Sequence, residues 1–124
     1  MALGAVGQIH ISVTDLDRSV AFYRDVLELP FLFRVPGRSM AFFTAGDVRL
    51  YLGVPDSPEF RTHVLVYFTV DDIEAEHARL STHGVDFHGP PHVVHRDGPN
   101  DLWMCDFTDP DRQHLVLMQE RPAT

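Results

Sequence analysis

The chain has 124 residues, of which 44% are apolar and 23% charged, so it fits one globular domain and is not a fibrous or disordered protein. Its formal net charge is −8 and its basic residues form no cluster, so we expect no nucleic-acid partner. All ten basic residues are arginines, which excludes a Schiff-base lysine and a phosphate-loop lysine.

The sequence shows no membrane-spanning segment and no secretory signal. No apolar run approaches the roughly 18 residues that span a bilayer, and the first residues lack a basic stretch followed by an apolar one. Cys105 is the only cysteine, so it cannot form an internal disulfide, and its apolar strand favours an inert thiol. We expect a soluble, cytoplasmic protein without a membrane partner.

The first half predicts a strand, a helix and three further strands. Residues 7–14 alternate in character and are rich in β-branched types, as in a half-buried strand. Asp15 offers an oxygen to cap a helix, whose apolar stripe runs to Leu27 and which Pro30 is expected to end. The three strands that follow are expected at about 30–35, 39–44 and 48–53.

The second half repeats this order after a linker. Residues 54–61 contain two prolines and two acids, which is typical of an extended, solvated connection. A strand is expected at 63–70, then a helix capped by Asp71 or Asp72 and ended by Gly84 in a left-handed turn. Further strands are expected near 86–95, 101–108 and 113–119.

The two halves also match locally. Residues 13–17, Val-Thr-Asp-Leu-Asp, reappear as residues 70–74, Val-Asp-Asp-Ile-Glu, at a shift of 57 positions. Such self-similarity indicates an internal duplication, the alternative being chance likeness between two ordinary strand–helix units. The sequence therefore predicts two copies of a βαβββ unit.

Residues 13–27 and 106–115 resemble a known family, the glyoxalase/bleomycin-resistance/dioxygenase proteins of the vicinal oxygen chelate superfamily. The likeness extends over about 7–119, although Arg112-Gln113 stands where Gly-Asn or Gly-His is common in the family. It implies one α+β domain over 1–124, with modules at about 7–53 and 62–119 whose sheets form a cup-shaped, partly closed barrel. It also implies a homodimer. The fold hosts lyases, isomerases, dioxygenases and non-catalytic drug-binding proteins, so function depends on the site.

Enzymes of the family hold a divalent metal with side chains from the first and last strand of each module. The corresponding positions here are Gln8, Tyr51, Leu65 and Val116. Leucine and valine have no lone pair to offer, and a neutral phenol is a poor ligand. We therefore expect no cofactor at this site.

A displaced metal site is the alternative. His10, His63 and His114 each lie two residues from one of those positions, and a shift of two keeps a side chain on the same face of a strand. Imidazoles suit zinc, iron, nickel or copper. A divalent ion there would make the protein a metal-dependent lyase, isomerase or dioxygenase.

Without a metal, the inward strand positions predict a ligand pocket with aromatic walls and a few polar anchors. We expect it to bind a small aromatic or drug-like molecule. Two other interpretations stay open: the aromatic rings fill the core, or the module only mediates assembly. The expected ligand-binding residues are Gln8, His10, Arg49, Tyr51, Tyr67, His92 and Trp103.

Overall fold

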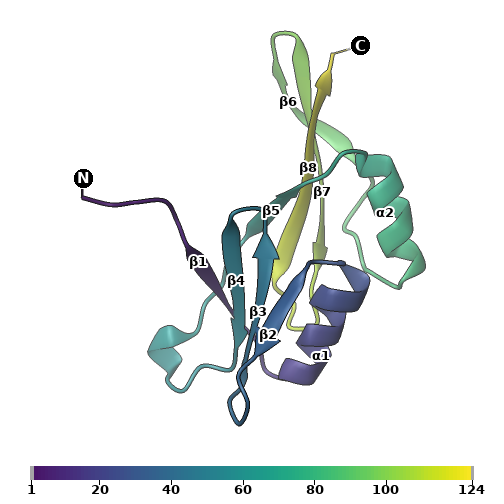
Figure 1. The fold of residues 1–124 in the computed structure, drawn as a ribbon. Coiled ribbons are helices and arrows are strands. Elements are labelled where there is room, and N and C mark those ends of the chain that lie inside the picture. Colours follow the sequence, from purple (N-terminus) through teal and green to yellow (C-terminus); the bar gives the residue numbers. More distant parts are fainter. Residues whose placement is uncertain (1, 124) are drawn as a thin grey trace. The chain divides into compact units, whose positions relative to one another are not determined.

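The computed structural model describes residues 2–123, apart from the side chain of Asp97. The chain forms two compact units that divide between His63 and Val64. Each unit consists of a four-stranded sheet with a helix against one face (Figure 1). None of the helices within residues 2–123 is long and apolar enough to cross a membrane.

In the first unit, the strands follow the order β1-β4-β3-β2 across the sheet. The first strand pairs parallel with the last, and the other pairs are antiparallel. A 3₁₀ turn, Pro58–Phe60, lies in the connection to the second unit. The elements are β1 Gln8–Ser12, α1 Leu16–Ala21, a π-helical turn Phe22–Val26, β2 Phe31–Arg34, β3 Met40–Ala45 and β4 Val48–Gly53.

The second unit repeats this arrangement with the order β5-β8-β7-β6, and again its first and last strands pair parallel. The α+β fold of two βαβββ units, each with a mixed four-stranded sheet, is therefore confirmed. Its elements are β5 Val66–Thr69, α2 Ile73–Thr82, β6 His92–Asp97, β7 Asn100–Thr108 and β8 His114–Pro122.

Both helices begin at the expected caps. The Asp15 carboxylate accepts a hydrogen bond from the backbone N–H of Arg18 at 3.1 Å, and Asp72 accepts one from Ala75 at the same distance. Gly84 follows α2 in the left-handed conformation, with φ of 81°, as expected.

The expected end of the first helix was wrong. Its helical turns finish at Val26, and Glu28 adopts a left-handed φ of 61°, so the chain has left the helix before it reaches Pro30. The backbone N–H of Leu27 donates to the carbonyl of Phe22, a five-residue step that widens the last turn.

One face of each sheet packs on the helix of its unit and forms the core. In the first unit, the side chains of Ile11, Phe43 and Leu52 on this face are completely buried. Phe107 and Leu115 have the same role in the second unit. Because strand side chains alternate between faces, the neighbouring positions form a second face that the helix does not cover, here called the open face.

Candidate functional site

The open face of the first unit carries a row of four stacked rings, one from each strand. His10 on β1 stacks on Tyr51 of β4, with ring centroids 4.5 Å apart and planes at 21°. Tyr51 in turn lies 5.1 Å from Phe42 of β3 at 18°, and Phe42 lies 4.7 Å from Phe33 of β2 at 29°. We call these four residues the aromatic row.

Strand register places the four rings side by side. His10 is paired with Tyr51, Tyr51 with Phe42, and Phe42 with Phe33. Phe43, one residue further along β3, points to the helix and is completely buried. The row is thus made by cross-strand aromatic pairs, whose members are close enough to stabilise one another.

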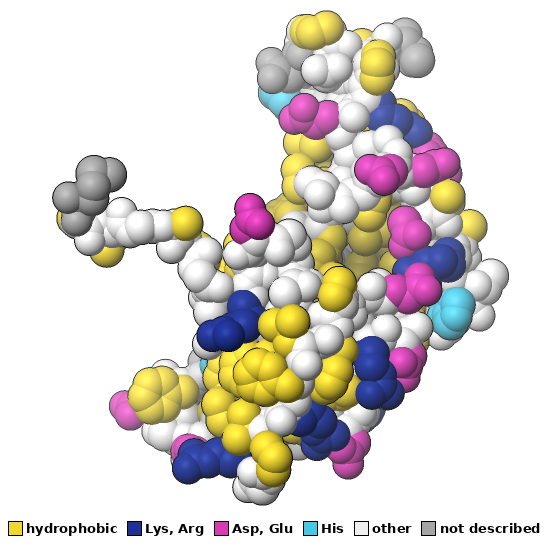
Figure 2. Space-filling model, in the orientation of Figure 1, with side chains coloured by type: hydrophobic (Ala, Val, Ile, Leu, Met, Phe, Trp, Pro, Cys, Tyr) yellow, Lys and Arg dark blue, Asp and Glu magenta, His cyan; other side chains and the backbone are white. Residues whose placement is uncertain are grey.

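A polar pair lies beside the aromatic row. Gln8 and Arg49 are register partners, and the Arg49 Nε donates a hydrogen bond of 2.8 Å to the Gln8 Oε1. The Arg49 guanidinium also lies 5.1 Å from the centre of the Phe42 ring, a cation–π distance. Figure 2 shows hydrophobic side chains gathered over the sheet of this unit, with arginines at their margin.

Gly53 makes room for the Tyr51 ring. A Cβ at position 53 would lie 2.5 Å from the Tyr51 hydroxyl oxygen and 2.6 Å from two ring carbons. Tyr51 also borders a cavity of about 380 Å³ that Met40, Arg38 and Asp56 help to line. The ring is therefore held between its neighbours in the aromatic row and its own strand.

The open face of the second unit is a different kind of surface. Leu65 directly precedes β5 and is 54% exposed, and Tyr67 lies on β5 and is 46% exposed. They help to line a pocket of about 350 Å³ together with His92 of β6. The other residues of this pocket are Val94, Met104, Cys105, Asp106, His114 and Val116.

Trp103 is not brought together with Tyr67 and His92. It lies on the same face of β7 as the buried Cys105 and Phe107, which is the face that α2 covers. The Arg121 guanidinium lies 4.0 Å from the centre of the Trp103 ring and forms two hydrogen bonds with Glu74 of α2. This contact caps the indole from the helix side of the sheet.

Arg121 also changes the pKa of Glu74 on α2. Its hydrogen bonds lower the pKa of Glu74 below the ordinary value. The pair therefore stabilises the fold at pH values above the ordinary pKa of a glutamate. This contribution is lost as the pH falls through the lowered pKa of Glu74.

Replacing Arg121 with alanine is expected to uncover Trp103 and to cost about 1 kcal/mol of unfolding free energy, because the pair is partly exposed to solvent. Trp103 emission should shift towards longer wavelength. Urea unfolding at neutral pH and at acid pH should show a smaller acid loss in the variant than in the wild type. An unchanged emission spectrum would contradict this placement of Arg121.

The three histidines of the alternative metal site do not lie in one unit. His10 and His63 belong to the first unit and His114 to the second. His10 stacks on Tyr51, whereas His114 lies beside Asp106 and His88. Sequence reasoning missed Asp106 and His88 as partners of His114.

The positions that correspond to the family's metal ligands do not fit a metal. The Gln8 oxygen already accepts from Arg49, and Tyr51 is stacked between two rings. Leu65 and Val116 offer no donor atom to an ion. These four positions therefore lack the donor set of a metal centre.

Cys105 gives no sign of a nucleophile. Its side chain is 2% exposed on the helix side of β7. Burial, with the carboxylates of Asp106 and Glu74 adding to it, raises the pKa of the thiol to about 11. The thiol is therefore protonated near neutral pH.

Two βαβββ units in tandem, each with a parallel first-to-last strand pair, define the class of α+β fold to which this chain belongs. Residues 5–117 match the model of the Glyoxalase/Bleomycin resistance protein/Dioxygenase superfamily. The chain belongs to this superfamily.

Solved structures agree with this assignment. TnmS3, an antibiotic-binding protein from Streptomyces sp. CB03234, is 26% identical with a TM-score of 0.74, and 99% of each chain is covered. A lactoylglutathione lyase from Agrobacterium tumefaciens is 22% identical with a TM-score of 0.75, and 96% of each chain is covered. A superfamily member from Sphaerobacter thermophilus DSM 20745 reaches a TM-score of 0.78 at 20% identity, over 96% of this chain and 99% of that one.

Proposed function

We propose that this protein binds a small, flat, partly aromatic molecule on the open face of its first unit, and that this binding needs no metal ion. The observation that carries the proposal is the aromatic row. Its outer ring, Phe33, is 45% exposed, so a flat molecule can extend the stack. TnmS3, an antibiotic-binding protein, is similar to this chain, which supports a small molecule as the ligand.

Arg49 and Gln8 supply the polar part of the proposed site. Arg49 lies against the Phe42 ring while its Nε bonds Gln8, so its remaining guanidinium N–H groups are held close to the aromatic row. Guanidinium groups recognise carboxylates and carbonyl oxygens in a planar, directional manner. We infer that the ligand carries an acidic or carbonyl oxygen at the edge of its ring system.

Tyr67 and His92 belong to the pocket of the second unit, and we infer that they contact an apolar part of a ligand there. Trp103 lies on the side of β7 that α2 covers, where Arg121 lies over its ring, so it is not part of the proposed site. For the same reason, quenching of Trp103 is a poor measure of binding.

A Tyr51→Ala variant tests the proposal. Planar aromatic carboxylic acids and quinones are titrated by calorimetry, in EDTA, against the wild type and the variant. The variant should bind about tenfold more weakly or worse, because without the Tyr51 ring the aromatic row is broken and Phe42 and Phe33 lose the support that holds them in place for a ligand. Phe60→Ala is the matched control, since Phe60 is an exposed ring, 61% accessible, outside the aromatic row.

Equal affinity of the Tyr51→Ala and Phe60→Ala variants would contradict the proposal. So would binding that disappears in EDTA and returns with a divalent ion. The second result would favour a metal-dependent activity instead.

We also propose that the protein forms a homodimer. Several large apolar side chains on the sheets, Leu32 and Val94 among them, are 44% and 47% exposed, which leaves apolar area for a partner to cover. Light scattering coupled to gel filtration measures the mass directly. A mass near 14.1 kDa at micromolar concentration would contradict a dimer.

A further inference from the structure

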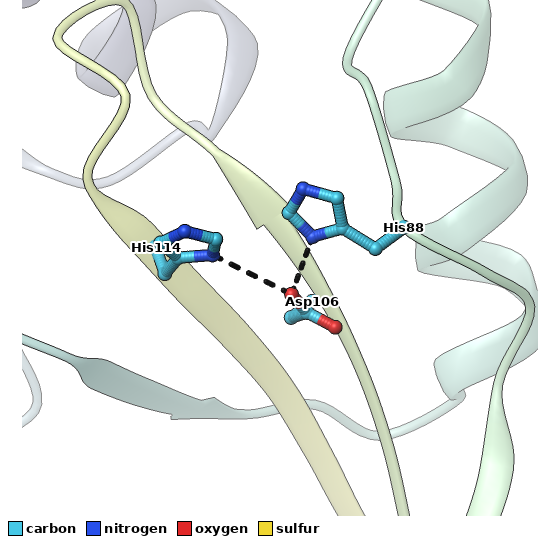
Figure 3. Close-up of side chains that lie close together, drawn as sticks. All are labelled: His88, Asp106 and His114. Atoms are coloured by element: carbon cyan, nitrogen blue, oxygen red, sulfur yellow. Dashed lines mark hydrogen bonds and ion pairs between the residues drawn. The ribbon is translucent and has the colours of Figure 1, made fainter.

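Three potential metal ligands converge in the second unit. One donor atom each from His88, Asp106 and His114 lie within 4.8 Å of one another, and Figure 3 shows the three side chains pointing towards a common centre. The His88 Nδ1 is 2.5 Å from the Asp106 Oδ2, and the His114 Nδ1 is 3.6 Å from the same oxygen.

The backbone holds the three residues in place. Asp106 lies on β7 and His114 at the start of β8, on the same face of two paired strands, with Thr108 opposite His114 and Val116 opposite Asp106. The backbone N–H of His88 donates to the carbonyl of Asp106 at 3.0 Å. The cluster therefore sits on regular structure and on a segment hydrogen-bonded to it, which favours a site that exists before an ion arrives.

The donor set suits a first-row transition ion. Two imidazoles and one carboxylate are ligands that zinc, cobalt, nickel and iron accept. With bonds of about 2.0–2.1 Å in a tetrahedron, neighbouring donors would be about 3.3 Å apart. The 3.6 Å separation of Asp106 and His114 is close to this value. The His88 Nδ1 and the Asp106 Oδ2 form a hydrogen bond, and an ion bound to both atoms would displace its proton.

The surroundings leave room for a fourth ligand. Asp106 and His114 also line the pocket of about 350 Å³, so an ion held between them borders this pocket. His88, Asp106 and His114 are 47%, 40% and 55% exposed, which gives an ion a path from solvent. The net charge of −8 also raises the local concentration of cations.

We propose that His88, Asp106 and His114 bind one divalent transition ion of the zinc class, with an open coordination position at the pocket of the second unit. This site goes beyond the proposed aromatic binding, because its three ion ligands lie outside the aromatic row, although the open position borders the pocket that Tyr67 and His92 also line. A molecule with an oxygen or nitrogen donor and an apolar body would occupy the open position.

The test uses untagged full-length protein stripped with a chelator. Zn²⁺ is titrated by calorimetry, and Co²⁺ by absorption, since tetrahedral cobalt has a strong visible band. His88→Ala, Asp106→Asn and His114→Ala are compared with two histidine controls. His92→Ala changes the same pocket outside the cluster, and His10→Ala changes the aromatic row of the first unit. Circular dichroism and thermal melting report whether each variant is folded.

We expect one ion per wild-type chain and a cobalt band of tetrahedral intensity. Each cluster variant should lose at least about tenfold in affinity while it melts like the wild type. The two controls should bind as the wild type does. Because binding expels a proton, the affinity should also fall in acid.

No saturable binding near one ion per chain would overturn the proposal. Equal loss in His92→Ala or in His10→Ala would do so too, and the latter result would point to the His10, His63 and His114 set. If a cluster variant fails to fold, the absorption of the wild-type protein with Co²⁺ still tests the proposal. Absence of a band of tetrahedral intensity there would contradict it. Aromatic binding in EDTA is measured separately, so either idea can fail alone.

Discussion

Phe43→Ala is expected to lower the free energy of unfolding by about 3–5 kcal/mol, the usual cost of deleting a buried aromatic ring. The Phe43 side chain is completely buried on the helix side of β3. It contacts Tyr23 of the first helix, with ring centroids 6.2 Å apart, and Phe31 of β2 at 5.4 Å. Since small domains are stable by about 5–15 kcal/mol, the variant should lose a large share of its stability.

Phe33→Ala is the matched control because it removes the same ring from the open face. Phe33 is 45% exposed and, among residues 2–123, stacks on Phe42 alone, so its loss should cost about 1 kcal/mol. Urea unfolding followed by circular dichroism measures both variants. Ligand affinity should respond in the opposite order: Phe33→Ala weakens binding, and Phe43→Ala changes it little while the protein is folded. Similar stability losses would contradict the assignment of the two faces.

Gly53→Ala is expected to cost about 1–3 kcal/mol of unfolding free energy, as overpacked sites do. The added methyl group would lie 2.5–2.6 Å from the hydroxyl oxygen and two ring carbons of Tyr51, so the ring must leave its place between His10 and Phe42. Affinity for aromatic ligands should therefore fall about as far as in Tyr51→Ala. Urea unfolding and calorimetric titration measure the two effects.

A double variant separates this clash from a general effect on β4. When Tyr51 is alanine, the methyl group at position 53 meets no ring, so Gly53→Ala should then cost much less. The two substitutions should be coupled by about 1 kcal/mol or more, as for residues in contact. Strict additivity would show that Gly53 matters for another reason.

Much of the fold was predictable because local signals and the duplication agree. Asp15 was expected to cap the first helix, and Asp71 or Asp72 the second, from their place before an apolar stripe. The carboxylates of Asp15 and Asp72 do accept backbone N–H groups. Alternation along β1 and β4 indicated that Gln8, His10, Arg49 and Tyr51 share a face. Their register then shows them in contact.

Other features of the fold could not be predicted from the sequence. Glu28 takes a left-handed conformation, which sequence patterns seldom indicate for a glutamate. The expected strand at 86–95 was wrong in its bounds: β6 begins at His92, and Phe87 forms only an isolated bridge with Phe107. A bulge between Val93 and His95 shifts the register as well.

Two residues of the second unit were also not predicted in their observed places. Trp103 was expected in the pocket because it lies near the start of its strand, where it could stack on a flat ligand, but alternation with Cys105 and Phe107 puts it on the helix side. His88 could not be joined to Asp106, because their contact depends on the single bridge that ties the segment before β6 to β7. No spacing along the chain predicts that contact.

The parallel pairing of each unit's first and last strands has a consequence during synthesis. Gln8 pairs with Arg49 and Ser12 with Gly53. The strand β1 therefore has no partner strand until residue 53 has been synthesised and has emerged from the ribosome. Until then Ile9 and Ile11, which flank His10, remain exposed on an unpaired strand, and the same delay recurs for β5, whose partner starts at His114. Long-range pairings of this kind form late and slowly. Nascent chains of this protein therefore have two intervals in which an open strand edge is available to other chains or to a chaperone.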